Sequence, residues 1–345
     1  MTEPFFSVIT VCYNDGDILE QCLNAVRDQT FRDFEFVFVI NGSTDNTREI
    51  IGQFREEHPE IRITIGEIET NRGLSNGRNK GLSLATGKYI TFNDSDDWMD
   101  RDCLQAVHDA LTKEETDQVI QEVRIITEDG TEADHVYYSP EPSRWTKNSL
   151  QGNFYKRSVF TENGITFNEK TYFDDLYVAM CFNAASDSFQ VIRSAHYNML
   201  LRSRSFTHID QKKNQFMAQR LGETFACMTW IGDTLKSEQE KDEYVYSCAL
   251  HYYSVIFLGA FPSRKERTAY YDRCKDVMDQ YYPGYYRNKR ISLRKENGFC
   301  GHFKRNVWLC ARLERIDARL HNRAMMHLLL GGYQFSTRKG LYKQR

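Results

Sequence analysis

The fold of this chain is decided by residues 89–98, YITFNDSDDW, in which a short apolar run leads directly into three carboxylates. The run at 89–93 is rich in aromatic and β-branched residues, which is typical of a buried strand. Similar runs precede it at 7–13, 34–40 and 61–65. The sequence therefore predicts four buried strands in its first hundred residues.

Amphipathic helical patterns separate these runs, at 18–29, 44–54 and 75–85. The third pattern ends before Gly87, and glycine is a common helix stop. Regular alternation of strands and helices is typical of a parallel, doubly wound sheet. We therefore expect an α/β fold in which helices flank a mostly parallel sheet.

The second half of the chain has a different character, because helical patterns continue there without comparable strand runs. We place the boundary near 210–215, which gives a first domain at 1–212 and a mainly helical region at 213–345. The apolar stretch at 244–261 contains polar residues and is near the lower length limit for crossing a bilayer, so we expect a buried helix there.

Composition is that of a globular protein, with 41% apolar and 27% charged residues and a net charge of −3. Residues 285–345 nevertheless carry fifteen Lys/Arg and three Asp/Glu, so the C-terminal segment is strongly basic. No secretory signal is visible, and the nine cysteines form no C-x-x-C pair. These features predict a cytoplasmic protein in a reducing compartment and argue against a zinc site.

In an open parallel sheet, ligands bind beyond the carboxyl ends of the strands. Polar, turn-forming segments follow all four predicted strands, at 12–15, 41–45, 71–75 and 94–97. The three carboxylates of the last segment would repel one another without a cation, and their hard oxygens suit Mg²⁺ or Mn²⁺. A solvated acidic turn that caps a following helix is the alternative.

Other nucleotide-binding patterns are missing. The sequence contains no G-x-G-x-x-G after the first strand and no G-x-x-x-x-G-K-[ST], which counts against dinucleotide oxidoreductases and P-loop NTPases. We therefore expect a pyrophosphate to be bound through a metal ion rather than by a glycine-rich loop. Nothing in the sequence points to nucleic acid as a partner.

With these segments assembled, roughly the first 210 residues resemble the inverting family 2 glycosyltransferases, which have the GT-A fold. Eight short segments match in the family's order, and they lie at 7–14 (SVITVCYN), 41–47 (NGSTDNT), 71–79 (NRGLSNGRN), 85–90 (ATGKYI), 92–98 (FNDSDDW), 155–157 (YKR), 164–167 (GITF) and 173–176 (FDDL).

The resemblance implies a donor site built around a D-x-D motif. Asp94 would face the ribose, Ser95 would belong to the donor-binding site, and Asp96 would bind Mn²⁺ or Mg²⁺. Tyr13 would lie along the nucleobase, although a core tyrosine at a strand end is the alternative. Arg78 would reach the base or the phosphates, with an exposed helix arginine as the alternative.

Three further positions complete the implied site. Asp174 and Asp175 stand where the family has Glu-Asp, and Asp175 would act as the general base. The alternative for this pair is a set of acids favoured by a helix N-terminus. Arg202 or Arg204 would clamp a phosphate, unless both are exposed loop arginines.

Two departures from the family bear on the donor. The family commonly has an acid where this chain has Asn41, and that acid often binds uracil, so the nucleobase stays open although a UDP-sugar is favoured. The family's frequent proline is replaced by Val11, which we still place at the donor site.

These residues together predict transfer of a sugar from a nucleotide diphosphate to an acceptor hydroxyl of a glycan or lipid-linked glycan, with inversion. A metal at Asp96 would stabilise the leaving group, and Asp175 would deprotonate the acceptor. A sugar nucleotidyltransferase is the nearest alternative, although residues 13–17 lack its basic side chains. A catalytically silent nucleotide-sugar-binding module is a second alternative.

The basic C-terminal segment contains one more pattern. Between 304 and 330, apolar residues recur at helical spacing beside a row of arginines, which predicts a basic amphipathic helix; the two sets are Leu309, Leu313, Ile316 and Leu320, and Arg312, Arg315, Arg319 and Arg323. Either the apolar stripe packs on the catalytic domain or on a second subunit of a homodimer, or the helix binds an anionic membrane at the inner face of the cell membrane.

Overall fold

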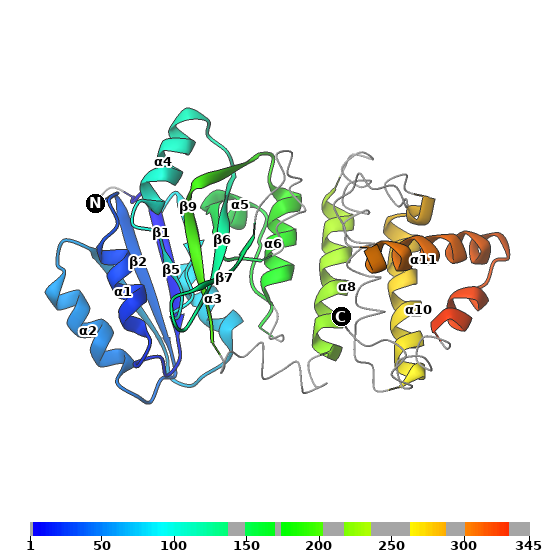
Figure 1. Ribbon diagram of the computed structural model, residues 1–345, viewed down its shortest axis with the longest axis horizontal. Coiled ribbons are helices and arrows are strands. Elements are labelled where there is room, and N and C mark those ends of the chain that lie inside the picture. The colour runs from blue at the N-terminus through cyan, green and yellow to red at the C-terminus, as the bar shows by residue number, and fades with distance from the viewer. Residues whose placement is uncertain are drawn as a thin grey trace. The chain divides into compact units, whose positions relative to one another are not determined.

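The computed structural model describes residues 3–136, 149–169, 174–202, 217–235, 263–287 and 301–330. The chain divides into two compact units, residues 1–209 and 210–345 (Figure 1). Across the described ranges, no helix is both long enough and apolar enough to cross a bilayer. The helix expected at 244–261 lies outside the described residues.

The first half of unit 1 contains the four predicted strands, which pair in parallel in the order β3-β2-β1-β4. They are β1 (Phe6–Cys12), β2 (Phe34–Asn41), β3 (Arg62–Ile68) and β4 (Tyr89–Phe92). The three predicted helices are also present, as α1 (Leu19–Arg27), α2 (Thr47–Glu57) and α3 (Leu74–Leu84). The strand β3 extends beyond its predicted end and is partly exposed, because it lies at the edge of the sheet.

The sheet continues beyond β4 with a mixture of strand directions. The strand β8 (Asn153–Lys156) is antiparallel to β4 and to β6 (Gln118–Thr127), whereas β9 (Phe189–Leu201) is parallel to β6. The short β5 (Trp98–Met99) and β7 (Glu132–Val136) pair antiparallel with β9 and β6.

Three more helices belong to this unit, namely α4 (Cys103–Lys113), α5 (Arg157–Glu162) and α6 (Asp174–Ala185). Figure 1 shows helices packed around the sheet of unit 1. The predicted α/β class is confirmed, with a parallel first half and a mixed second half.

Close approach of α3 to the sheet decides where the helix presents its polar residues. A Cβ atom at Gly77 would lie 2.4 Å from Cγ1 of Val11, and one at Gly81 would lie 2.4 Å from Cγ2 of Ile9. Both distances are far below van der Waals contact, so any larger residue at these two positions would push α3 away from β1. The two glycines thereby place Arg78 against the carboxyl edge of the sheet.

Unit 2 is helical over the residues described. It contains α8 (Met217–Thr234), α10 (Arg264–Tyr281), the single turn η3 (Tyr285–Arg287) and α11 (Gly301–Arg319). Helix α10 begins at a side-chain cap, in which Ser263 Oγ accepts the Glu266 N–H at 3.2 Å. The Tyr282 hydroxyl donates to the Met228 carbonyl at 3.0 Å, which fixes the end of α10 against α8.

The basic amphipathic helix predicted for 304–330 is only partly correct. Helix α11 ends at Arg319, and a separate helical segment follows at 324–330. The Asp317 carboxylate accepts the N–H groups of Met325 and Met326 at 2.9 and 3.0 Å, so it caps the second segment.

The face of α11 that is buried is not the apolar stripe. Glu314 and Asp317 are fully buried, and Glu314 accepts a hydrogen bond from the Tyr285 hydroxyl. The expected apolar stripe is instead largely exposed, at Leu309, Ile316 and Leu320. Hydroxyl and backbone N–H donors make the burial of these two acids tolerable.

Two of the arginines beside that stripe bind partners in the protein. The Arg315 Nε donates to the Tyr286 carbonyl at 3.0 Å, and Arg323 forms ion pairs with Asp272 and Asp276. These contacts lie within unit 2, so part of the positive charge of the segment is already paired there.

Candidate active site

The loops that follow β1 and β2 are joined by hydrogen bonds at the carboxyl edge of the sheet. The Asn14 N–H donates to Ser43 Oγ at 3.1 Å, and Asn14 Oδ1 accepts the Thr44 N–H at 2.8 Å. Asn14 has a φ of 54°, a left-handed conformation that asparagine tolerates better than most residues. The two loops therefore form one continuous rim.

Asn41 lies at the end of β2 and stabilises the third loop. Its Nδ2 donates to the Gly73 carbonyl at 3.0 Å and to Asn71 Oδ1 at 3.3 Å, while its Oδ1 accepts the Arg72 N–H at 3.3 Å. Both ends of the buried amide are thus engaged within the protein. Asn41 shapes the loop at 71–73 in this structure.

The D-x-D segment follows β4, and the acid directly after it, Asp97, is structural. Asp97 is buried and accepts hydrogen bonds from the Tyr197 hydroxyl and the Leu200 N–H, both at 2.8 Å. The same hydroxyl accepts the Asp94 N–H at 3.1 Å. Burial raises the pKa of Asp97 well above its ordinary value. Asp97 and Tyr197 together fix the backbone from which Asp94 and Asp96 project.

Asp94 is joined to Asp175, which is distant in sequence, through two donors. Arg78 Nη2 lies 3.0 Å from Asp94 Oδ1, and Arg78 Nη1 donates to Asp175 Oδ1. Gln151 Nε2 lies 3.0 Å from Asp94 Oδ2 and 3.3 Å from Asp175 Oδ2. Each carboxylate therefore receives one bond from the arginine and one from the glutamine.

Arg78 is almost completely buried, with its side chain 2% exposed, so the alternative of an exposed helix arginine is wrong. A buried guanidinium requires ionised partners, and the two carboxylates supply them. The Phe167 ring adds a cation–π contact at 5.7 Å. Arg78 holds the predicted donor loop and the predicted base in one cluster.

Asp96 faces Arg202, whose Nη2 lies 2.6 Å from Asp96 Oδ2. Burial raises the pKa of Asp96, the Asp94 carboxylate raises it further, and Arg202 lowers it. A partly buried carboxylate beside another carboxylate favours a cation, so the donor set around Asp96 fits a hard divalent ion.

Tyr13 and Ser95 lie on either side of a residue that the sequence analysis did not single out. The Ser95 hydroxyl donates to Asp15 Oδ2 at 2.7 Å, and the Tyr13 N–H donates to the same oxygen at 2.9 Å. Burial raises the pKa of Asp15. The Tyr13 ring is 46% exposed, so the alternative of a core tyrosine is wrong.

Sequence reasoning missed two residues of this site, Asp15 and Gln151. Asp15 follows the first strand and could have been found from its position at a strand end. Gln151 lies in a turn before β8, with no pattern around it that marks a site.

Three other residues were predicted to belong to the site, namely Val11, Asp174 and Arg204. Val11 is half-buried and contacts α3 beside Gly77. Asp174 begins α6, but its side chain lies outside the described residues, as does Arg204.

Comparisons with known proteins agree with this geometry. The family model described as glycosyl transferase family 2 matches residues 7–175. TuaG of Bacillus subtilis (strain 168), which carries the name of a teichuronic acid biosynthesis glycosyltransferase, is 34% identical over 139 residues, or 40% of this chain. The match covers 54% of TuaG, so the chain spans about half the length of that relative.

Solved structures share the fold at low sequence identity. TarS of S. aureus (residues 1–349, in complex with UDP) is 18% identical with a TM-score of 0.66, and the match covers 92% of each chain. A mannosyltransferase from Pyrobaculum calidifontis, in complex with GDP-Man and Mn²⁺, is 17% identical with a TM-score of 0.51, covering 91% of this chain and 88% of the other. Residues 7–175 of this chain, with their strand-end carboxylates and their parallel sheet, therefore belong to glycosyltransferase family 2 and have the GT-A fold.

Proposed function

We propose that the protein transfers a sugar from a nucleoside diphosphate sugar to a hydroxyl of a glycan or lipid-linked glycan acceptor, with inversion at the anomeric carbon. The observation that carries this proposal is the cluster in which Arg78 and Gln151 join Asp94 to Asp175. It brings a donor-loop carboxylate and a candidate base to one place.

Asp175 is the proposed general base. It is partly exposed, with 30% of its side chain accessible, so an acceptor hydroxyl can reach it. Arg78 and Gln151 each occupy one of its oxygens and thereby fix its orientation, which is what a base needs to meet a proton at the correct angle. A single base opposite the leaving group implies direct displacement and therefore inversion.

Asp96 is the proposed ligand for Mn²⁺ or Mg²⁺, with Asp94 beside it. When bound there, such an ion would stabilise the charge that develops on the leaving diphosphate. The exposed ring of Tyr13 would stack on the nucleobase, and Ser95 would lie beside the ribose. Arg202 would turn from Asp96 to the phosphates when a donor binds.

The donor class is supported by the solved structures that share this fold, which contain UDP, UDP-GlcNAc or GDP-Man. We favour a UDP-sugar. Both the Nδ2 and the Oδ1 of Asn41 are already hydrogen-bonded to residues 71–73. We therefore propose that Asn41 shapes the base pocket and does not use both amide atoms to bind the base.

The proposal is tested by incubating the protein with UDP-sugars and Mn²⁺ and measuring release of UDP. In the absence of an acceptor, slow hydrolysis of at least one UDP-sugar is expected, and it should need the divalent ion. A protein that binds UDP with Mn²⁺ but releases none from any nucleotide sugar would be a silent binding module instead.

We also propose that unit 2 makes peripheral contact with an anionic membrane. Four large apolar side chains are exposed on α11 and the segment after it, and the exposed Arg312 and Arg319 lie on the same helix; the apolar residues are Leu309, Ile316, Leu320 and Leu328. Apolar insertion combined with basic charge is the usual combination at a membrane interface.

A further inference from the structure

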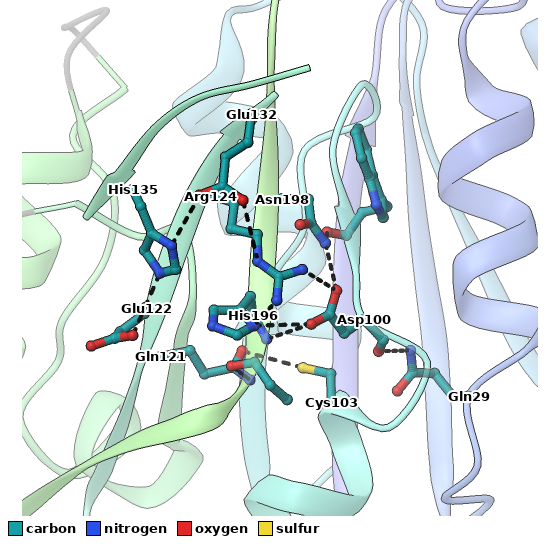
Figure 2. A network of polar contacts seen from close by, with 12 residues as sticks. Gln29, Asp100, Cys103, Gln121, Glu122, Arg124, Glu132, His135, His196 and Asn198 are labelled. Carbon is teal, nitrogen blue, oxygen red and sulfur yellow. Dashed lines mark hydrogen bonds and ion pairs between the residues drawn. The ribbon is translucent and has the colours of Figure 1, made fainter. Parts of the chain in front are cut away.

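A second group of polar residues lies on the sheet face that the proposed active site does not use. The register of β6 and β9 places Glu122 opposite His196, and the register of β6 and β7 places Arg124 opposite His135. Paired residues on neighbouring strands point to the same face, so these four side chains gather there (Figure 2). The next residue, Tyr197, points to the other face, where it contacts Asp97.

Three of these side chains offer metal-ligating atoms close together. One atom each from Glu122, His135 and His196 lies within 4.8 Å of the other two. Glu122 Oε2 is 3.4 Å from His135 Nε2. Two ligands bound tetrahedrally to Zn²⁺ at ordinary bond lengths are ~3.3 Å apart, so this pair is already at the spacing that a zinc ion requires.

Each histidine has a carboxylate at its other ring nitrogen. Glu132 Oε1 lies 3.2 Å from His135 Nδ1, and Asp100 Oδ2 lies 3.1 Å from His196 Nδ1. Histidines that bind metals almost always donate their second N–H to such a group, which fixes the tautomer and the ring orientation. The contact with Glu132 leaves His135 Nε2 facing Glu122 Oε2, and the contact with Asp100 leaves Nε2 as the nitrogen of His196 for a metal.

Two arginines border the group. Arg193 Nε lies 3.3 Å from Glu122 Oε1, so the other oxygen of that carboxylate is directed to His135. Arg124 Nη2 lies 2.6 Å from His196 Nδ1, which cannot accept from Arg124 and donate to Asp100 at the same time. A metal at Nε2 selects the second arrangement, and Arg124 keeps its contact with Asp100.

Charge and burial also suit a cation. The three carboxylates of Asp100, Glu122 and Glu132 exceed the two arginines by one negative charge when the histidines are neutral. The side chains of His135 and His196 are each 12% exposed, and that of Glu122 is 5% exposed. A partly buried group with surplus negative charge and imidazole ligands is suited to a borderline divalent ion.

We propose that Glu122, His135 and His196 bind one Zn²⁺-class divalent ion, with water as the fourth ligand. The ion would tie β7 to β6 and β9. The strand β9 supplies Tyr197 and ends beside Arg202, so the site would stiffen the element that positions the proposed donor-loop contacts. The cysteine pattern gave no indication of zinc, because these ligands are histidines and a glutamate from three separate strands.

The test uses the full chain without a tag, after a chelator has removed any bound metal. The chain carries Asp96→Asn, which removes the proposed Mn²⁺ or Mg²⁺ ligand of the active site. Isothermal titration with Zn²⁺ alone should show one ion per chain. At a hundredfold excess over Kd, the Tm should rise by roughly 5 °C or more. Co²⁺ should give the visible absorption of a four-coordinate site with imidazole ligands. Absence of both binding and the Co²⁺ bands would overturn the proposal.

Variants identify the ligands. His135→Gln and Glu122→Gln, each in the Asp96→Asn chain, should lose Zn²⁺ binding. His58→Gln is the matched control, because His58 also contacts a carboxylate, Glu60, but belongs to no group of three metal-ligating side chains among the residues that the structure describes. Zn²⁺ binding that persists in both ligand variants, or that is lost equally in the control, would overturn the assignment.

A further measurement needs no variant, so its result does not depend on whether a variant folds. Zn²⁺ should shield His135 and His196 from diethyl pyrocarbonate, as mapped by mass spectrometry, while His58 stays reactive. Equal modification of all three with and without Zn²⁺ would contradict the site. This site is independent of the proposed transfer reaction, so its failure would leave that proposal unaffected.

Discussion

Arg202 Nη2 lies 2.6 Å from Oδ2 of Asp96, so the cation that faces the proposed metal ligand is a side chain of the protein. Because a divalent ion and a guanidinium beside the same carboxylate repel each other, we expect metal binding and the Arg202 contact to compete. The proposal that Arg202 leaves Asp96 for the phosphates of a donor follows from this competition.

Arg202→Ala should change two affinities in opposite directions. Mn²⁺ alone should bind more tightly, because its competitor at Asp96 is gone, whereas UDP with saturating Mn²⁺ should bind more weakly by about tenfold or more, because a charged donor to phosphate is lost. Isothermal titration measures both. A variant that weakens Mn²⁺ binding and leaves UDP binding unchanged would show that Arg202 serves only to order Asp96.

Asp96→Ala should abolish the Mn²⁺-dependent part of UDP binding while leaving Tm nearly unchanged. Asp96 projects from a polar loop, and its hydrogen-bond partner Arg202 is partly exposed, so little folding energy depends on the pair. The matched control is Asp28→Ala, which removes a surface aspartate paired with Arg27. Near-normal Mn²⁺-dependent UDP binding in Asp96→Ala would refute the metal assignment.

Asp175→Asn should keep the affinity for UDP and Mn²⁺ but lower turnover by ~10² or more, as expected when a base is lost and binding is not. Asparagine has nearly the same shape, and its single amide oxygen can still accept from Arg78, while its Nδ2 replaces the oxygen that faces Gln151. Asp94 continues to accept from both donors, so the cluster should stay assembled. Initial rates with the active UDP-sugar, measured beside binding titrations, separate the two quantities. A fall in affinity at unchanged turnover would make Asp175 a binding residue.

Arg78→Ala should destabilise unit 1 by about 3–5 kcal/mol, because it removes the buried cation between Asp94 and Asp175. Denaturant unfolding measures the free energy. The exposed Arg72, which precedes the same helix, supplies the control Arg72→Ala, for which a change below about 0.5 kcal/mol is expected. If both variants were equally stable, the carboxylate cluster would contribute little to folding.

The parallel half of the sheet was predictable because its strands are continuous apolar runs with helices between them, as at 34–40 and 89–93. The strand-end position of Asp94 and Asp96 was predictable for the same reason. The cluster in which Arg78 and Gln151 join Asp94 to Asp175 was not predictable from the sequence. Arg78, Gln151 and Asp175 meet through contacts between residues up to 97 positions apart, which no local period encodes.

For the C-terminal helix α11, the sequence predicted which residues share a face but not which face is buried. The spacing of Leu309, Ile316 and Leu320 predicted an apolar face, and the side chains do share a face, but Glu314 and Asp317 occupy the buried one. Periodicity identifies which residues lie together on a helix. It does not tell which face is covered when buried acids find donors such as Tyr285.

That exposed face leads to the last prediction, in which Ile316→Asp and Leu320→Asp together should abolish binding to anionic vesicles. Ile316 is 40% and Leu320 59% exposed, so the changes should cost the fold little. They remove apolar insertion and oppose the attraction of nearby arginines, each worth about 1 kcal/mol at an anionic surface. Asn322→Asp is the control, because it adds a negative charge at an exposed polar site nearby.

Co-sedimentation with vesicles of anionic and of neutral lipid, at low and high salt, measures the effect. The unchanged protein and Asn322→Asp should pellet with anionic vesicles and should be released as salt screens the charges. Recovery of the unchanged protein in the supernatant regardless of vesicles would refute the membrane proposal. If light scattering then gave a dimer that the double variant dissociates, the apolar face would be an interface between two copies of this chain.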